Sequence, residues 1–168
     1  MIRTLLPVML LPLLAGMAMA EPAAPAAKPD VRITVKAVSA GSDRSNKSAT
    51  STRRLEIHLE NREHRELGGL KIEWRIAGED IRSNRKTVEA KGTKEIKLDA
   101  DGKLDVESGT AKFTEKEGEV KITGKGKTRR RTVGPDTGSR YAGYVVELFQ
   151  NGKLIAEAST NGLDKQLK

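Results

Sequence analysis

GYVVELFQNGKLIA, residues 143–156, is the stretch that decides the fold predicted by this sequence. Its first half alternates between two sets of side chains, which is the pattern of an extended strand whose faces differ. The pair Asn151-Gly152 follows, and these residue types suit a two-residue type I′ turn, because both of its central residues take positive φ. Residues 154–158 are again mostly apolar. The stretch therefore predicts two antiparallel strands joined by a tight turn.

The same alternation occurs in three stretches nearer the N-terminus. Residues 31–37, 54–60 and 70–76 place apolar side chains at every second position, with polar or charged residues between them. The side chains predicted to face inward are Val31, Ile33, Val35, Ala37, Leu55, Ile57, Leu59, Leu70, Ile72, Trp74 and Ile76. Trp74 is the only tryptophan, and its size makes it the expected anchor of the core.

The pattern is less regular in the middle of the chain. Residues 87–98 and 104–114 carry apolar residues around glycines, which predicts two or three strands with bulges. Val120 and Ile122 begin another short strand. Residues 41–51 are rich in Ser, Asn and Gly, and they predict a loop.

About seven short strands joined by turns predict an all-β domain over residues 30–160. The expected architecture is an antiparallel β-sandwich, with a barrel as the alternative. Helical periodicity is not sustained in this region. Residues 161–168 are polar and predict a flexible C-terminal tail.

The pattern resembles the immunoglobulin-like and fibronectin-type-III-like sandwiches of exported bacterial proteins. The likeness rests on Trp74 in the third strand, on Tyr141 or Tyr144 near the start of the penultimate strand, and on the final hairpin. In immunoglobulin domains a tyrosine at this place makes a corner hydrogen bond. The cysteine pair of antibody domains is missing, so the resemblance is to the general sandwich. It implies a binding or structural role and specifies no ligand.

Residues 1–20 have the three parts of a cleavable signal peptide. Arg3 gives the basic start, residues 5–14 the apolar stretch, and Ala18-Met19-Ala20 a small-x-small cleavage site. An uncleaved anchor is the alternative, but the uncharged stretch is shorter than the ~20 residues of a spanning helix. Residues 21–29 form a Pro/Ala-rich linker. We therefore expect a periplasmic or extracellular protein with no transmembrane segment in its mature chain.

The composition limits how this domain is stabilised and what it meets. The chain has no cysteine, 3 % aromatic residues and 32 % charged residues, so its core is expected to consist of Val, Ile, Leu and Ala. Without residues 1–20 the formal net charge falls from +8 to +7, because Arg3 is the only charge removed. An exported basic protein meets anionic envelope polymers, glycans and lipid head groups rather than nucleic acid.

The sequence predicts no metal site and no cofactor. His58 and His64, the only histidines, lie ~20 Å apart if the chain between them is extended. Residues 99–105 have acidic residues in the spacing of a calcium loop, but Lys103 stands where the third ligand belongs. The pair Asp101-Gly102 favours a turn between two strands instead.

Catalysis is the weakest of the functional hypotheses. The chain has no Gly-x-Ser-x-Gly motif and no cysteine nucleophile. A hydrolase would need a cleft that gathers His58 or His64 with carboxylates. We therefore expect a protein that is not an enzyme, with a small secreted hydrolase as the remaining alternative.

The most distinctive segment of the mature chain is basic and glycine-rich. Residues 120–135 contain six basic residues and no acidic one, and we expect part of this segment to form a long loop. The candidate polyanion-binding residues are Lys121, Lys125, Lys127, Arg129, Arg130 and Arg131. Adjacent arginines can donate pairs of hydrogen bonds to phosphate or sulfate oxygens. The alternative interpretation is a solvated charged loop.

These observations predict an exported interaction or structural module of the cell envelope. Its partner is expected to be a protein or an anionic envelope component. The alternative function is binding of an anionic polymer, glycan or lipid head group through residues 121–131.

Overall fold

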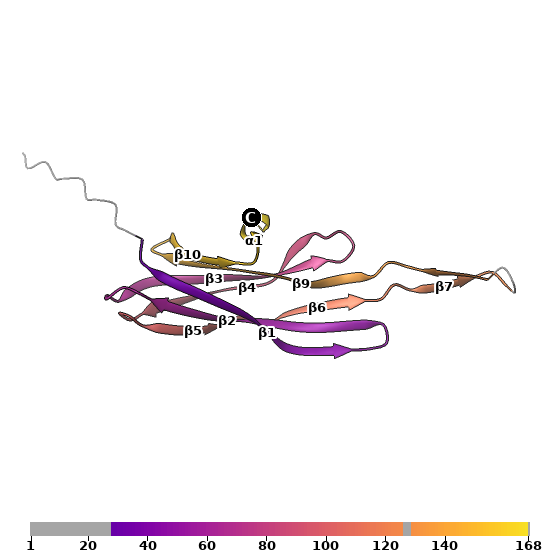
Figure 1. Cartoon of the computed structure of the whole chain (residues 1–168), viewed down its shortest axis with the longest axis horizontal. Coiled ribbons are helices and arrows are strands. Elements are labelled where there is room, and N and C mark those ends of the chain that lie inside the picture. The colour runs from indigo at the N-terminus through magenta and orange to yellow at the C-terminus, as the bar shows by residue number, and fades with distance from the viewer. Residues whose placement is uncertain (1–27, 126–128, 168) are drawn as a thin grey trace, which may run out of the picture.

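The computed structural model describes residues 28–125 and 129–167, and these residues form strands and one short helix (Figure 1). The predicted signal peptide, most of the predicted linker and Lys127 lie outside the described residues. The elements are β1 Val31–Arg44, β2 Ser48–Asn61, β3 Leu67–Asp80, β4 Lys86–Leu98, β5 Lys103–Glu107, β6 Ala111–Lys116, β7 Val120–Thr123, β8 Arg130–Val133, β9 Thr137–Gln150, β10 Lys153–Ser159 and α1 Leu163–Gln166.

Eight of these strands form one antiparallel sheet. Its order is β1-β2-β6-β9-β3-β4, with β5 also paired to β2 and β10 paired to β9. Only two residue pairs, Glu115 with Gly138 and Lys116 with Thr137, join β6 to β9. Strands β7 and β8 form a separate two-stranded sheet. The prediction of an all-β antiparallel protein is confirmed, although the described residues contain more strands than the seven expected.

One hydrophobic cluster joins the two halves of the large sheet. Strands β1, β2, β5 and β6 contribute from one half, and β3, β4 and β9 from the other. The inward positions predicted for β2 and β3 are buried, and the first strand's Val31 is buried while its later apolar residues are partly buried. The buried members of this cluster are Val31, Leu55, Ile57, Leu59, Leu67, Leu70, Ile72, Trp74, Ile76, Leu98, Val106, Ala111, Phe113, Val146 and Leu148. The core is therefore largely aliphatic, as the composition predicted.

The final hairpin has the turn that its sequence predicted. Asn151 and Gly152 have φ values of 49° and 79°, and the ladder closes between Gln150 and Lys153. The tyrosine contact differs from that of an immunoglobulin corner. The Tyr144 hydroxyl lies 3.5 Å from the carbonyl oxygen of Val35, which belongs to β1 rather than to the chain just before the tyrosine.

Two segments are more ordered than the sequence indicated. The predicted loop of residues 41–51 is a hairpin, because residues 41–44 pair with β2, whose other edge pairs with β6. These polar side chains lack alternation, so the backbone pairing left no signal in the sequence. The predicted flexible tail contains α1, and Leu163 is buried against Ala77 and Val145. A single leucine in a polar segment shows no periodicity, so this contact could not be predicted from the sequence.

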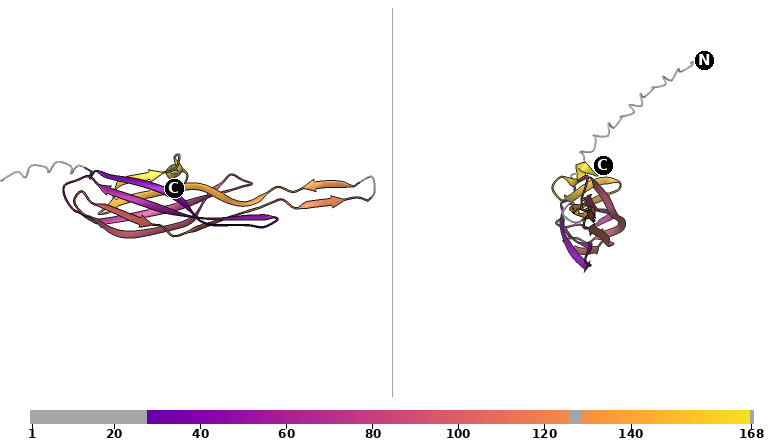
Figure 2. Two further views of the ribbon diagram at one scale, coloured as in Figure 1. Left: turned by 60° about the horizontal axis from the view of Figure 1, so that its bottom comes forward. Right: turned by 90° about the vertical axis from the view of Figure 1, so that its right-hand side faces the viewer.

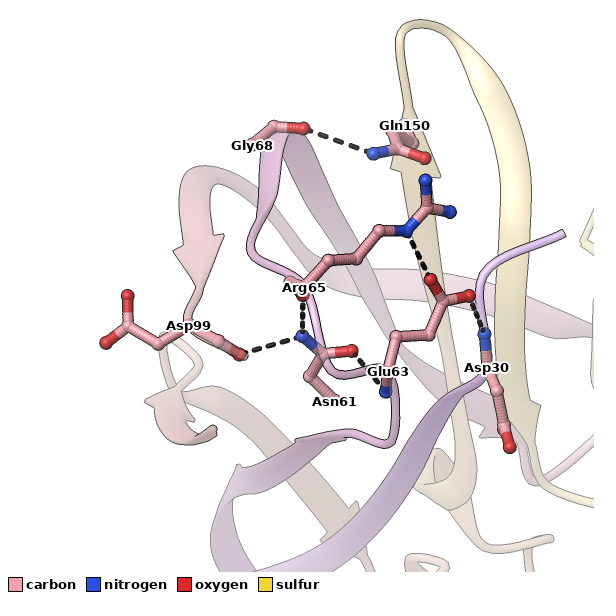
Figure 3. Close-up of polar contacts among 7 residues, drawn as sticks. All are labelled: Asp30, Asn61, Glu63, Arg65, Gly68, Asp99 and Gln150. Atoms are coloured by element: carbon pink, nitrogen blue, oxygen red, sulfur yellow. Dashed lines mark hydrogen bonds and ion pairs between the residues drawn. The ribbon is translucent and has the colours of Figure 1, made fainter. Parts of the chain in front are cut away.

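At the end of the sheet remote from β7 and β8, one buried side-chain amide links neighbouring turns by hydrogen bonds (Figures 1 and 3). Asn61 is 1 % exposed, and its Nδ2 donates to the carbonyl oxygens of Arg65 at 2.8 Å and Asp99 at 2.7 Å. Its Oδ1 accepts from the Glu63 backbone N–H at 3.0 Å. The Glu63 carboxylate accepts in turn from the Asp30 backbone N–H and from the Arg65 side chain. One side chain thus joins the β2–β3 turn to the end of β4.

Candidate binding surface

The basic segment forms a β-ribbon that projects beyond the large sheet (Figure 2). Strands β7 and β8 pair antiparallel, with Val120 opposite Val133 and Ile122 opposite Arg131. The predicted short strand at Val120 is confirmed, whereas the expectation of a long loop is wrong for residues 130–133, which form β8. Each of these strands has only four residues and faces water on both sides. Their apolar and polar residues therefore alternate too weakly to predict a strand pair.

A glycine contact holds the ribbon where it leaves the sheet. A Cβ atom on Gly118 would lie 1.7 Å from the carbonyl oxygen of Gly134, so the two backbones cross too closely for any side chain there. The Gly118 N–H donates to Asp136 Oδ1 at 2.9 Å, and the Gly134 N–H donates to the Glu119 carbonyl oxygen at 2.9 Å. These bonds join the two segments that link the ribbon to β6 and to β9.

The register divides the ribbon into a basic face and an apolar face. Residues paired across antiparallel strands point to the same side, so Lys121 and Arg130 share one face with two threonines. We call the side formed by Val120, Ile122, Arg131 and Val133 the apolar face, and the side formed by Lys121, Thr123, Arg130 and Thr132 the basic face. All eight residues are exposed.

The six predicted binding residues are thus only partly brought together. Lys121 and Arg130 lie on the basic face, Arg131 lies on the apolar face, and Lys125 and Arg129 lie beyond the paired residues. Lys127 lies outside the described residues. Within the described part of the chain, Lys121 and the three arginines take part in no ion pair. Their charges are open to an external anion.

An open groove of about 540 Å³ lies at the base of the ribbon. Lys121 and Thr132 from the basic face line it, together with Glu117 and Glu119. Three further basic residues also line it. They are Lys47 from the β1–β2 turn, Arg82 from the β3–β4 turn and Lys116 from the end of β6. Sequence reasoning missed these three residues, because they are far apart in the chain and belong to no charge run.

Ordered turns position the added cations. In the β3–β4 turn, Asp80 Oδ1 accepts from the Ser83 N–H at 2.7 Å, the Ser83 hydroxyl at 2.8 Å and the Arg82 N–H at 3.1 Å. These hydrogen bonds, the one from the Ser83 backbone first, hold the pKa of Asp80 below its usual range. The Ile81 N–H donates to the Gly138 carbonyl oxygen at 3.0 Å, and the Glu117 N–H donates to the Lys47 carbonyl oxygen at 2.9 Å. Both turns are therefore tied to the base of the ribbon.

The two histidines form separate pairs with aspartates. His58 Nδ1 lies 2.6 Å from Asp105 Oδ1, on the neighbouring strands β2 and β5. His64 Nδ1 lies 2.9 Å from Asp101 Oδ2, and this contact raises the pKa of the exposed His64. In residues 28–125 and 129–167, no three His, Cys, Asp or Glu side chains are grouped to hold a metal ion. Nor does any helix there have the length and apolarity to cross a membrane.

Comparisons with known proteins give a distant structural resemblance only. No protein-family model matches the chain, and no curated protein matches it. The X-ray structure of Northeast Structural Genomics Consortium target SoR45 matches with a TM-score of 0.37 and 15 % identity, over 79 % of this chain and 89 % of that chain. A crystal structure from Akkermansia muciniphila matches with a TM-score of 0.33 and 14 % identity, over 79 % and 70 % of the two chains. Similarity of this degree assigns neither a family nor a ligand.

Proposed function

We propose that this chain is an exported, non-enzymatic β-sandwich of immunoglobulin-like type that acts as an interaction module of the cell envelope. Its binding element is the β7–β8 ribbon with the groove at its base, and its ligand carries phosphate or sulfate groups. Export is inferred from residues 1–20, and the sandwich from the large hydrophobic cluster that joins the two halves of the sheet. Periplasmic or extracellular location follows from export.

The observation that carries this proposal is the convergence of cations from four parts of the chain. Lys47, Arg82, Lys116 and Lys121 line one groove that contains only two carboxylates, Glu117 and Glu119. Like charges brought together without equal compensation repel one another, and a bound anion relieves that repulsion. The ribbon adds Arg129, Arg130 and Arg131, whose planar guanidinium groups suit phosphate and sulfate oxygens.

Binding to a soluble polyanion tests the proposal directly. A chain that begins at Glu21 keeps every element of the described fold, and its binding to long-chain polyphosphate is measured at rising salt. We expect the ribbon variant Lys121→Ala/Arg130→Ala/Arg131→Ala and the groove variant Lys47→Ala/Arg82→Ala/Lys116→Ala each to bind about tenfold more weakly, since each removes three exposed contacts.

The control removes the same charge from another part of the surface. Lys91, Lys94 and Lys153 are exposed on β4 and β10, so the variant Lys91→Ala/Lys94→Ala/Lys153→Ala has the same net charge as the ribbon and groove variants. Unchanged binding in this control shows that position matters beyond total charge. Equal losses in all three variants would show nonspecific attraction and would refute the proposed site.

A further inference from the structure

The apolar face of the ribbon is the most exposed aliphatic surface among the described residues. Val120, Ile122 and Val133 are 48 %, 52 % and 59 % exposed, whereas the other exposed large hydrophobic residues, Val88 and Leu154, are 41 % and 37 % exposed. The register places the three ribbon residues on one side, and the groove is lined from the opposite side by Lys121 and Thr132. The apolar face is therefore turned away from the groove, and the described residues leave its three aliphatic side chains about half exposed.

Strand propensity alone does not require this apolar face. Thr123 and Thr132 occupy the opposite side of the same strands, and their β-branched side chains favour an extended chain without adding a fully apolar surface. A soluble polyanion would engage the basic residues and leave three aliphatic side chains in water. An occupant with a negatively charged surface and an apolar interior would cover these aliphatic side chains and also pair with Arg131, which lies on the same face.

We propose that the apolar face docks on a bilayer that contains anionic lipid. This inference rests on the proposed function, because the same ribbon supplies the charge. Val120, Ile122 and Val133 enter the boundary between head groups and acyl chains, where shallow burial of aliphatic side chains is favourable. Arg131, on the same face, extends its guanidinium to the lipid phosphates while its methylene stem stays in the apolar layer.

The charges favour a bilayer over a second copy of the chain. Face-to-face pairing of two ribbons would bring two Arg131 side chains together, and residues 120–135 contain no acidic residue to compensate them. An anionic membrane surface attracts basic residues that lie close to it, and this attraction is weakened by salt. The occupant with complementary charge is therefore the lipid surface.

Vesicle binding by the chain that begins at Glu21 tests this inference. We expect binding to vesicles of phosphatidylcholine with phosphatidylglycerol, and at least tenfold weaker binding to vesicles of phosphatidylcholine alone. The variant Ile122→Ser/Val133→Ser should lose about tenfold in affinity for the anionic vesicles, because two aliphatic side chains no longer enter the boundary. The control Val88→Ser/Leu154→Ser removes two exposed aliphatic side chains from other strands and should bind as the parent chain does.

Polyphosphate binding separates this inference from the proposed function. Ile122→Ser/Val133→Ser should keep its affinity for polyphosphate, which uses only the basic residues. Equal vesicle binding by this variant and the parent chain would refute docking through the apolar face, even where polyphosphate binding stands. Self-association of the parent chain that this variant abolishes would instead identify a second copy as the occupant, and it would also overturn the inference.

A fluorescent reporter locates the contact. Ile122→Trp should show a blue-shifted emission on anionic vesicles and quenching by brominated acyl chains, whereas Val88→Trp should show neither. The native Trp74 is buried, so it contributes a constant background to both variants. Equal quenching of the two reporters would place the contact elsewhere and refute the assignment.

Discussion

Replacement of Asn61 should show how strongly one buried amide secures the end of the sheet. Asn61→Ala removes two hydrogen bonds donated by Nδ2, to the carbonyl oxygens of Arg65 and Asp99, and one accepted by Oδ1 from Glu63. Each bond contributes about 1 kcal/mol net, and the partners lose their contacts in a site where Asn61 is 1 % exposed. We expect a loss of about 3 kcal/mol in the free energy of unfolding. For a domain of this size that corresponds to a fall in Tm of roughly 8 °C.

Chemical denaturation of the chain that begins at Glu21 measures this loss, with Asn46→Ala, at an exposed turn position, as the control. Asn61→Asp gives a second test. It keeps an acceptor for the Glu63 N–H, but it replaces the donor Nδ2 with a carboxylate oxygen that faces the carbonyl oxygens of Arg65 and Asp99 and repels them. The pKa of the introduced carboxyl is then raised by folding, so its destabilisation should be greatest near pH 7 and diminish below about pH 5. A loss in Asn61→Ala within about 0.5 kcal/mol of the Asn46→Ala value would refute the reasoning.

Two other predictions concern the core and a turn. In Gly92→Ala the new Cβ would lie 2.3 Å from Trp74 Cζ2, so the indole must move. We expect a loss of about 1–3 kcal/mol in the free energy of unfolding and a shifted tryptophan emission. Gly109→Ala is the control, because the space around Gly109 is open. The lowered pKa of Asp80 means that its contribution to stability is present above the ordinary carboxyl pKa and is lost as pH falls through the lower folded value. Asp80→Asn should therefore flatten the dependence of the denaturation midpoint on pH between about pH 5 and pH 2, and an unchanged slope would contradict this assignment.

Strand alternation made parts of β1, β2, β3 and β9 predictable. In β2 and β3 one face is buried, so the inward residues repeat with period two in the sequence. Ile57 in β2 and Ile72 in β3, which are 1 % and 0 % exposed, are two of these inward residues. The Asn151-Gly152 turn was predictable for a different reason, since few residue types tolerate two successive positive φ values. Burial of one face and the demands of the turn both leave patterns in adjacent residues, so these elements could be predicted from the sequence.

Contacts between distant segments left no such signal. The groove joins Lys47, Arg82 and Lys116 to Lys121, and their proximity depends on which strands become neighbours in the sheet. The strand order is set by packing over the whole core, so it cannot be predicted from the distribution of charged residues along the chain. The sequence therefore indicated the ribbon half of the candidate site and missed the half supplied by the turns.

The ribbon is small, so its stability depends on whether its apolar face is covered. A two-stranded hairpin alone is marginally stable in water, because neither face is covered. The glycine crossing at Gly118 and the two hydrogen bonds at its base fix where the ribbon begins, but they add no packing along β7 and β8. Burial of Val120, Ile122 and Val133 against an external surface would supply that packing. Under the proposed docking, these three residues would couple the stability of the ribbon to occupancy of its apolar face, and Arg131 on the same face would favour an anionic surface.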